Sequence, residues 1–143
     1  MKDIEIIKNS TNYSIGNIGE FSELGQYLYV HPKMNLPMPG KVFVGEKLNT
    51  SSMEISFQTL AAGKEIPFDH KHRENEEVYV VIKGKGIFII DDEVTDVKEG
   101  SIVRISPDAK RRWCNNSDKE LIVMVIQAVH QSLNNFTVTD GYM

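Results

Sequence analysis

The chain has 143 residues, of which 41% are hydrophobic and 25% are charged, and its formal net charge at pH 7 is −4. This composition is typical of one globular domain with its own core, and it disfavours a disordered chain. The acidic balance, with a pI near 5.6, provides no broad basic surface for nucleic acid. The basic run at residues 110–112 is short and typical of a solvated turn.

The longest apolar run, residues 121–126, is far shorter than the ~20 residues that a membrane-spanning helix requires. The first ten residues carry charges where a secretory signal peptide needs an apolar core, and the single cysteine allows no internal disulfide. These features predict a cytoplasmic protein without a membrane partner.

Residues 1–45 are expected to form an extended N-terminal arm. A short helix fits residues 18–28, and the three prolines in residues 31–40 favour extended backbone. Three large apolar side chains of this arm are unfavourable in water unless the main domain or a second subunit covers them. They are Met34, Leu36 and Met38.

From residue 53 onward, short strand patterns alternate with turn signals. The expected strands are residues 53–60, 87–90, 94–97, 102–105 and 121–129. The last one is apolar at nearly every position, as in a strand covered on both faces, and Gln127 interrupts it as an expected inward polar residue. Such evenly spaced strands predict an all-β sandwich or barrel, and a double-sheet jelly roll protects most strand edges.

Two histidines, His70 and His72, precede an acidic turn and the next strand. If they lie in a strand, they share one face, because side chains alternate. Residues 73–76 indicate a turn and residues 78–82 the returning strand, so a hairpin would place Glu77 opposite both imidazoles. Two imidazoles and one carboxylate with open positions are typical of a catalytic site for a divalent transition metal. The alternative interpretation is a solvated loop.

This segment resembles the first motif of the cupin superfamily, which is a glycine, two histidines one residue apart, a glutamate and a second glycine. The matching residues are Gly63, His70, His72, Glu77 and Gly84, and only the first spacer differs, by one residue. The resemblance covers residues 53–129 and implies a double-stranded β-helix, or jelly-roll barrel, over residues 46–132, followed by a tail over residues 133–143. It also implies a divalent metal (zinc, nickel, iron or manganese) held by the two histidines and the glutamate.

The second cupin motif is degraded. The motif is a glycine, a spacer and then Pro-x-Gly-x-x-His-x-x-x-Asn, and it aligns with Gly100, Pro107, Ala109, Arg112 and Asn116. Ala109 replaces its second glycine, and Arg112 replaces the histidine that supplies the usual last ligand. A guanidinium has no free lone pair for a metal. About 5 Å from a dication, at an effective dielectric constant of about 20, it would be repelled by on the order of 6 kcal/mol. Either Arg112 turns aside and binds an anionic substrate on the metal, or the metal is absent and Arg112 pairs with Glu77.

Three neighbouring side chains add further interpretations. Tyr79 should share the inward face of Glu77, where its hydroxyl either serves as a proton donor to a ligand or satisfies a hydrogen bond in the core. Cys114 should share the face of Arg112, as a thiolate ligand or as a small buried hydrophobe. Trp113 is expected to face the opposite side, in an interface or against the outer sheet.

The resemblance to small cupins implies two candidate functions. The first is a metal-dependent isomerase, epimerase, decarboxylase or oxygenase acting on a small sugar-like or carboxylic molecule, with Tyr79 as the catalytic proton donor and Arg112 and Gln127 as substrate-binding residues. The second is a metal-free module that binds or senses a small molecule without turnover. Cupins that resemble this chain commonly form homodimers, so the resemblance also implies a homodimer.

Overall fold

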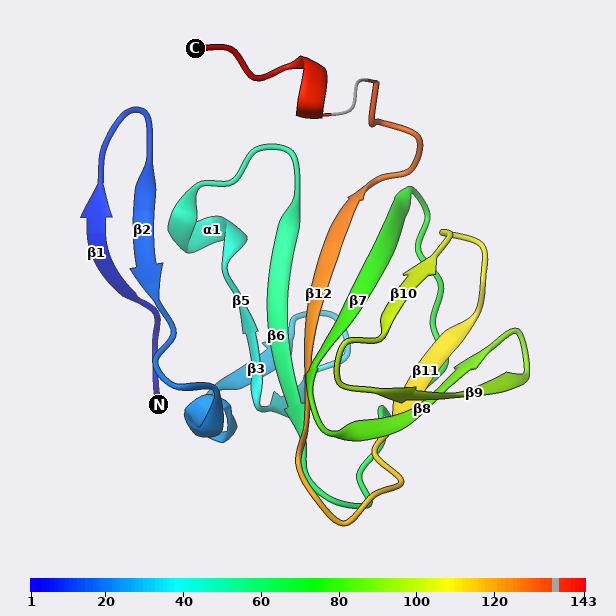
Figure 1. The fold of residues 1–143 in the computed structure, drawn as a ribbon. Helices are drawn as coiled ribbons and strands as arrows, with labels where there is room; N and C mark the ends of the chain where they lie inside the picture. The colour runs from blue at the N-terminus through cyan, green and yellow to red at the C-terminus, as the bar shows by residue number, and fades with distance from the viewer. Residues whose placement is uncertain (135–136) are drawn as a thin grey trace.

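The computed structural model describes residues 1–134 and 137–143, and it consists mainly of β-strands (Figure 1). The strands are β1 (Glu5–Asn9), β2 (Ser14–Asn17), β3 (Leu28–His31), β4 (Leu36–Pro39), β5 (Lys41–Phe43), β6 (Glu54–Leu60), β7 (Asn75–Lys83), β8 (Lys85–Ile90), β9 (Glu93–Lys98), β10 (Ile102–Ile105), β11 (Arg111–Cys114) and β12 (Leu121–Val129). The helical elements in the described part are a 3-10 helix η1 (Phe21–Gln26), a single α-helical turn α1 (Gly45–Leu48) and a 3-10 turn η2 (Thr137–Thr139). No helix in this part is long and apolar enough to cross a membrane.

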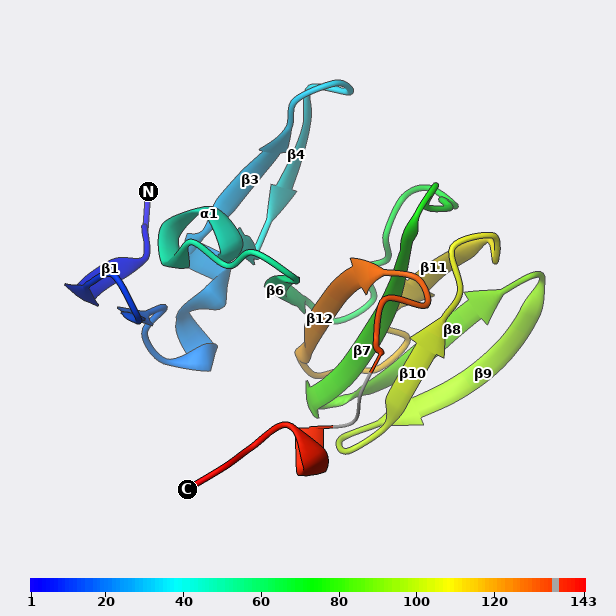
Figure 2. The ribbon, with the colours of Figure 1, turned by 90° about the horizontal axis from the view of Figure 1, so that it is seen from above.

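Two antiparallel sheets form the main domain. One has the order β10-β7-β12-β6-β5, and the other has the order β11-β8-β9. Seen from above, the second sheet lies across from β7 and β12 (Figure 2). This is the double-sheet jelly roll expected from the sequence, and the prediction of an all-β fold is confirmed.

Strand β7 shows how the sequence determines the sheet. Its side chains alternate between buried and half-buried from Glu77 to Ile82, as the period of two requires. The strand ends at Gly84, the glycine that closes the first motif, where φ is +84°. A Cβ atom at this position would lie 2.3 Å from the carbonyl oxygen of Glu120, so only glycine fits.

The segment before β7 differs from the predicted hairpin. His70 and His72 do not form a regular strand that pairs with β7; they lie in an extended loop that is joined to β11 by isolated bridges. Pro67 has no N–H to donate, which interrupts the ladder between the bridges. The prediction that the segment with His70 and His72 pairs with the next strand is therefore wrong, because this segment pairs with β11. The strand predicted at residues 78–82 does form, as part of β7.

The space between the two sheets holds the main core. Aromatic rings form its centre, where Phe88 stacks on Trp113 with ring centroids 6.1 Å apart and meets Tyr79 edge-on at 5.0 Å. Burying each large apolar side chain here contributes about 1.5–3 kcal/mol. The core residues are Leu60, Ile66, Tyr79, Val81, Phe88, Val97, Ile105, Trp113, Leu121, Val123 and Val125.

The N-terminal segment builds a second, smaller core against the outer side of the five-stranded sheet, around the fully buried Leu24 and Ile122. The expected helix at residues 18–28 is the 3-10 helix η1, and β3 and β4 form a hairpin of their own. Strand β5 pairs with β6, so the sheet of the barrel begins inside the segment that the sequence assigned to the arm.

Candidate metal centre and cavity

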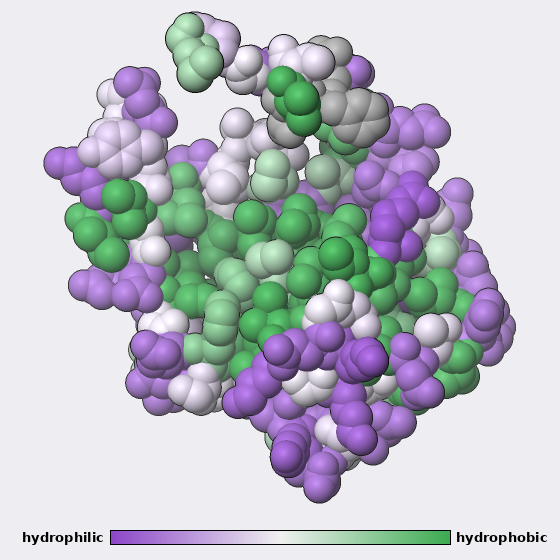
Figure 3. Space-filling model, in the orientation of Figure 1, coloured by the Kyte–Doolittle hydropathy of each residue, from purple (hydrophilic) through white to green (hydrophobic). Residues whose placement is uncertain are grey.

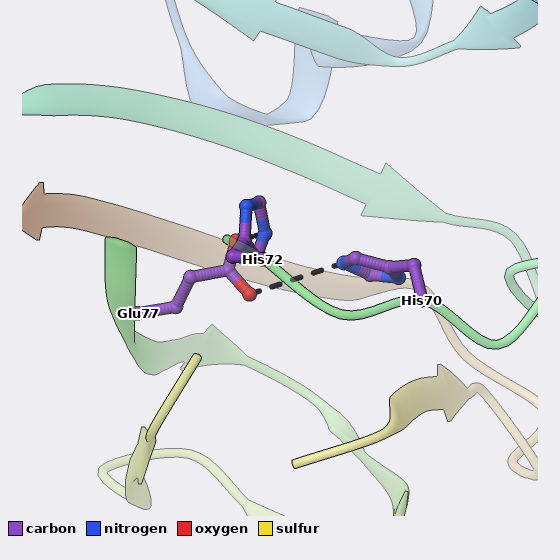
Figure 4. Close-up of side chains that lie close together, drawn as sticks. All are labelled: His70, His72 and Glu77. Atoms are coloured by element: carbon purple, nitrogen blue, oxygen red, sulfur yellow. Dashed lines mark ion pairs between the residues drawn. The ribbon is translucent and has the colours of Figure 1, made fainter. Parts of the chain in front are cut away.

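His70, His72 and Glu77 converge in the structure. Their ligand atoms all lie within 4.8 Å of one another (Figure 4). Glu77 Oε1 is 3.1 Å from His72 Nε2, and Glu77 Oε2 is 3.9 Å from His70 Nε2. The convergence predicted from the first motif is confirmed.

Backbone hydrogen bonds from both sheets position these three side chains. His70 exchanges two backbone bonds of 3.0 Å with Arg111, and the N–H of His72 donates to the carbonyl of Pro107 at 3.1 Å. Glu77 belongs to β7, between β10 and β12. The group therefore joins the three-stranded sheet to the five-stranded sheet.

The protonation states of His70 and Glu77 suit a divalent metal. Burial lowers the pKa of His70 to about 4, so its ring is neutral at neutral pH. Burial alone would raise the pKa of Glu77, but the neighbouring His72 and Tyr79 side chains and the charge of Arg111 outweigh it and lower the pKa to about 2. Neutral imidazoles and an ionised carboxylate are the forms that bind such metals.

Two ring nitrogens support the same interpretation. His70 Nδ1 and His72 Nε2 are buried and have no hydrogen-bond partner among the described residues. His72 Nε2 lies 3.1 Å from Glu77 Oε1 without forming a hydrogen bond to it. Buried polar atoms without partners are rare, because each one loses its hydrogen bonds to water. The donor set therefore fits a bound cation.

An arginine does pair with Glu77, but it is Arg111. This residue is fully buried, and its Nε donates to Glu77 Oε2 at 3.0 Å. Its Nη1 donates to the carbonyl oxygens of Ala109, at 2.8 Å, and Pro107, at 3.2 Å. These bonds fix one carboxylate oxygen of Glu77 and leave the other toward His72.

Arg112 points away from the group, which corrects its expected position. Its guanidinium pairs with Glu65 at 2.9 Å and with Asp69 at 3.1 Å, and it is not part of the cavity wall. Cys114 lies on the same side of β11 as Arg112, outside the group of three, and burial raises the pKa of its thiol.

The alternation of side chains along β11 explains why Arg112 and Trp113 do not lie where the sequence predicted. Arg111, Trp113 and Asn115 share the inward face, and all three are buried. Trp113, expected to face outward, is only 2% exposed and packs in the core. Arg111 and Asn115 keep the four-residue spacing of histidine and asparagine in the second motif, after a turn one residue shorter. The sequence does contain a signal for this register. A large apolar ring such as that of Trp113 is expected to be buried, and its burial places Arg111, and not Arg112, on the inward face.

Tyr79 lies on the inward face, as predicted. It is 2% exposed, and its hydroxyl donates to Glu77 Oε2 at 2.6 Å. Burial raises the pKa of this hydroxyl well above its ordinary value, with the nearby charge of Glu77 as a second cause. The contact shows a structural role for the hydroxyl, and the catalytic role of Tyr79 stays a prediction.

A cavity of about 680 Å³ adjoins the group. Gln127 lines it, as its inward position predicted. Sequence reasoning did not find the contribution of the N-terminal segment, which adds the β3–β4 hairpin and Lys41 of β5 to the wall. Nothing local in residues 28–43 signals a binding surface, because their place at the cavity depends on contacts between distant segments, such as the pairing of β5 with β6.

Comparisons with known proteins agree with this architecture. A family model described as the Cupin domain matches residues 56–127. The crystal structure of a cupin protein from Bacteroides fragilis is similar with a TM-score of 0.70 and 37% sequence identity, over 72% of this chain and 87% of that chain. The chain belongs to the cupin family, and the resemblance in its motifs is confirmed.

Two further proteins are similar to parts of this chain. A sugar phosphate isomerase of the cupin superfamily from Silicibacter pomeroyi shares the fold, with a TM-score of 0.59 and 17% identity over 71% of this chain and 68% of that chain. An uncharacterized protein of Methanocaldococcus jannaschii, MJ1618, is 40% identical over 55 residues, which is 38% of this chain. The chain spans less than half the length of that relative, 44%.

Proposed function

We propose that this cupin binds a divalent transition metal through His70, His72 and Glu77, and a small anionic molecule, sugar-like or carboxylic, in the adjoining cavity. The observation that carries the proposal is the convergence of the three ligand atoms within 4.8 Å, with His72 Nε2 buried and without a hydrogen-bond partner among the described residues. Three protein ligands leave open positions for oxygen atoms of the bound molecule, where the metal would serve as a Lewis acid.

The residues around the group would restrict how such a molecule binds. Arg111 and Tyr79 hold one oxygen of Glu77, so this carboxylate has one oxygen left for a metal. A sugar phosphate isomerase is among the proteins of similar fold, and phosphorylated sugars belong to the proposed ligand class. The type of reaction, whether isomerisation, epimerisation, decarboxylation or oxygenation, stays a prediction.

One observation favours a second candidate function, a metal-free module that binds a small molecule without turnover. The guanidinium of Arg111 already compensates the charge of Glu77, at 3.0 Å and out of water. Such an ion pair makes a cation less necessary for the stability of the buried carboxylate. In this case the two histidines would only line the cavity.

Metal analysis separates the two candidates. Protein purified without an affinity tag is stripped with a chelator, offered zinc, nickel, iron and manganese in turn, and assayed for bound metal. We expect about one metal per chain in the wild type, a loss in His72→Ala, and no change in the control His130→Ala, whose ring contacts Glu76 instead. A wild type that refuses all four metals would leave only the metal-free module.

We also propose a homodimer through the outer face of the five-stranded sheet. Ile102, Val80 and Met124 lie directly opposite one another on β10, β7 and β12, and Ile102 is 70% exposed. Figure 3 shows apolar side chains gathered over the middle of this face. Apolar patches of this kind commonly mark interfaces.

Light scattering after size exclusion tests the dimer. Met124→Asp should convert a dimer into a monomer at micromolar concentration, because it places a charge in the apolar row. The control Val94→Asp changes a residue on β9 that is 62% exposed, and it should leave the dimer intact. A monomeric wild type would contradict the proposal.

A further inference from the structure

Lys41 is a buried cation that the metal group does not use. Its residue is 8% exposed, and its side chain lines the cavity. The Nζ atom donates to Ser56 Oγ at 3.0 Å and lies 4.8 Å from the ring centroid of Phe43. Among the described residues, no carboxylate forms an ion pair with it. An ammonium carries three N–H donors, so one hydroxyl acceptor leaves it incompletely satisfied.

The nearest acidic side chains are already engaged. Glu77 accepts hydrogen bonds from Arg111 and Tyr79, and Glu54 accepts one of 2.8 Å from the backbone N–H of Gly45. Both carboxylates act on Lys41 only at longer range, while burial lowers its pKa to about 8. A buried charge without a close partner is unfavourable, so its presence here calls for an anionic partner.

The backbone holds Lys41 firmly in this place. The preceding Gly40 has φ +76°, its N–H donates to the carbonyl of Tyr27 at 2.8 Å, and its carbonyl accepts from Thr59 at 3.0 Å. A Cβ atom at Gly40 would lie 2.5 Å from Thr59 Cγ2 and 3.0 Å from the Thr59 carbonyl oxygen. Glycine at this turn lets β5 enter the sheet beside β6, with Lys41 directed inward.

Two amide side chains line the same cavity as Lys41 and the metal group. Gln58 lies directly opposite Lys41 across β5 and β6, is 3% exposed, and lines the same cavity. Gln127 also lines the cavity and lies directly opposite Glu77 across β12 and β7. An ammonium next to amide groups suits an oxyanion flanked by hydroxyl groups.

The charges favour an anion over a neutral molecule. The charged residues that line the cavity are four cations, Lys33, Lys41, Lys71 and Arg73, and two anions, Asp69 and Glu77, so their formal net charge is +2 before any metal is bound. A divalent metal would add to this excess. The ligand of the cavity should therefore carry negative charge.

We propose that Lys41 binds the oxyanion of the ligand, a carboxylate or phosphate group of a small hydroxylated molecule whose other end faces His70, His72 and Glu77. Lys41 thus takes the role that the sequence assigned to Arg112. The orientation of the ligand rests on the proposed function, whereas binding of the anion by Lys41 does not require a metal.

Calorimetric titration of metal-free and metal-loaded protein tests this proposal. The probes are D-gluconate, glucose 6-phosphate and, as the neutral counterpart, glucose. We expect the wild type to bind at least one of the two anions at least tenfold more tightly than glucose. Lys41→Met should lower the affinity for that anion at least tenfold without changing the metal content. The control Lys85→Met, on the exposed start of β8, should change neither the anion affinity nor the metal content.

The outcomes distinguish the anion site from the metal site. Equal affinity of glucose and the anions in the wild type, or unchanged anion affinity in Lys41→Met, would overturn the proposal. Anion binding that depends on Lys41 in a protein that refuses metals would support it and reject the metal site. If Lys41→Met does not fold, Lys41→Gln removes the same charge. The comparison of the two anions with glucose in the wild type still tests whether the cavity prefers an anion.

Discussion

Replacing Arg111 by histidine should tighten metal binding. Arg111 Nε lies 3.0 Å from Glu77 Oε2. A metal bound to the other oxygen of Glu77, at about 2.0–2.2 Å, would lie on the order of 5 Å from the guanidinium. At an effective dielectric constant of about 20, a dication and a unit charge at that distance repel by on the order of 6–7 kcal/mol. Relaxation of the site reduces this value, so we expect at least a tenfold gain in affinity, about 1.4 kcal/mol.

The same substitution should lower the stability of the metal-free protein. It removes the hydrogen bonds to the carbonyls of Pro107 and Ala109 and leaves Glu77 without its cation. Breaking a buried pair in this way costs about 3–5 kcal/mol. Bound metal should restore most of the loss, because it binds the folded state alone. Thermal unfolding with and without metal measures this difference.

The assay for affinity is competition of zinc or nickel with a chromogenic chelator. Arg112→His is the matched control, since it makes the identical change one residue along the strand, where the side chain pairs with Glu65 and Asp69. It should leave the metal affinity unchanged. Unchanged or weaker binding in Arg111→His, or an equal gain in Arg112→His, would refute the assignment of Arg111 to the place of the missing ligand.

Two further predictions concern stability. Glu77→Gln leaves Arg111 buried and unpaired, so urea unfolding should show a loss of stability of about 3–5 kcal/mol. The double variant Glu77→Gln with Arg111→Met should lose less stability. Equal losses in the two variants would mean that the broken ion pair is not the cause. Burial lowers the pKa of Lys41 from 10.5 to about 8, and the charged groups that face it are Glu77 and Glu54. Between these two pKa values the unfolded chain therefore binds the Lys41 proton more tightly than the folded chain does. The stability of the metal-free protein relative to Lys41→Met should therefore rise by up to about 3 kcal/mol between pH 7 and pH 10; a difference that does not vary with pH would contradict the burial of the charge.

Much of the barrel follows from local pattern. The apolar run at residues 121–129 is strand β12 with the same bounds, and the short segments between turn signals are strands β8, β9 and β10. The grouping of His70, His72 and Glu77 was also predictable, because the spacing of the motif carries it. Period-two alternation and turn residues act over a few positions, so they are visible in the sequence.

The tertiary structure alone decided which arginine faces Glu77 and which lysine lines the cavity. Side chains of a strand alternate, so a turn shorter by one residue before β11 exchanges Arg112 for Arg111 on the inward face. The length of that turn depends on how the loop with His70 pairs with β11, which is a contact between distant segments. Lys41 becomes buried only because β5 pairs with β6 at the far edge of the sheet, and no local pattern encodes that pairing.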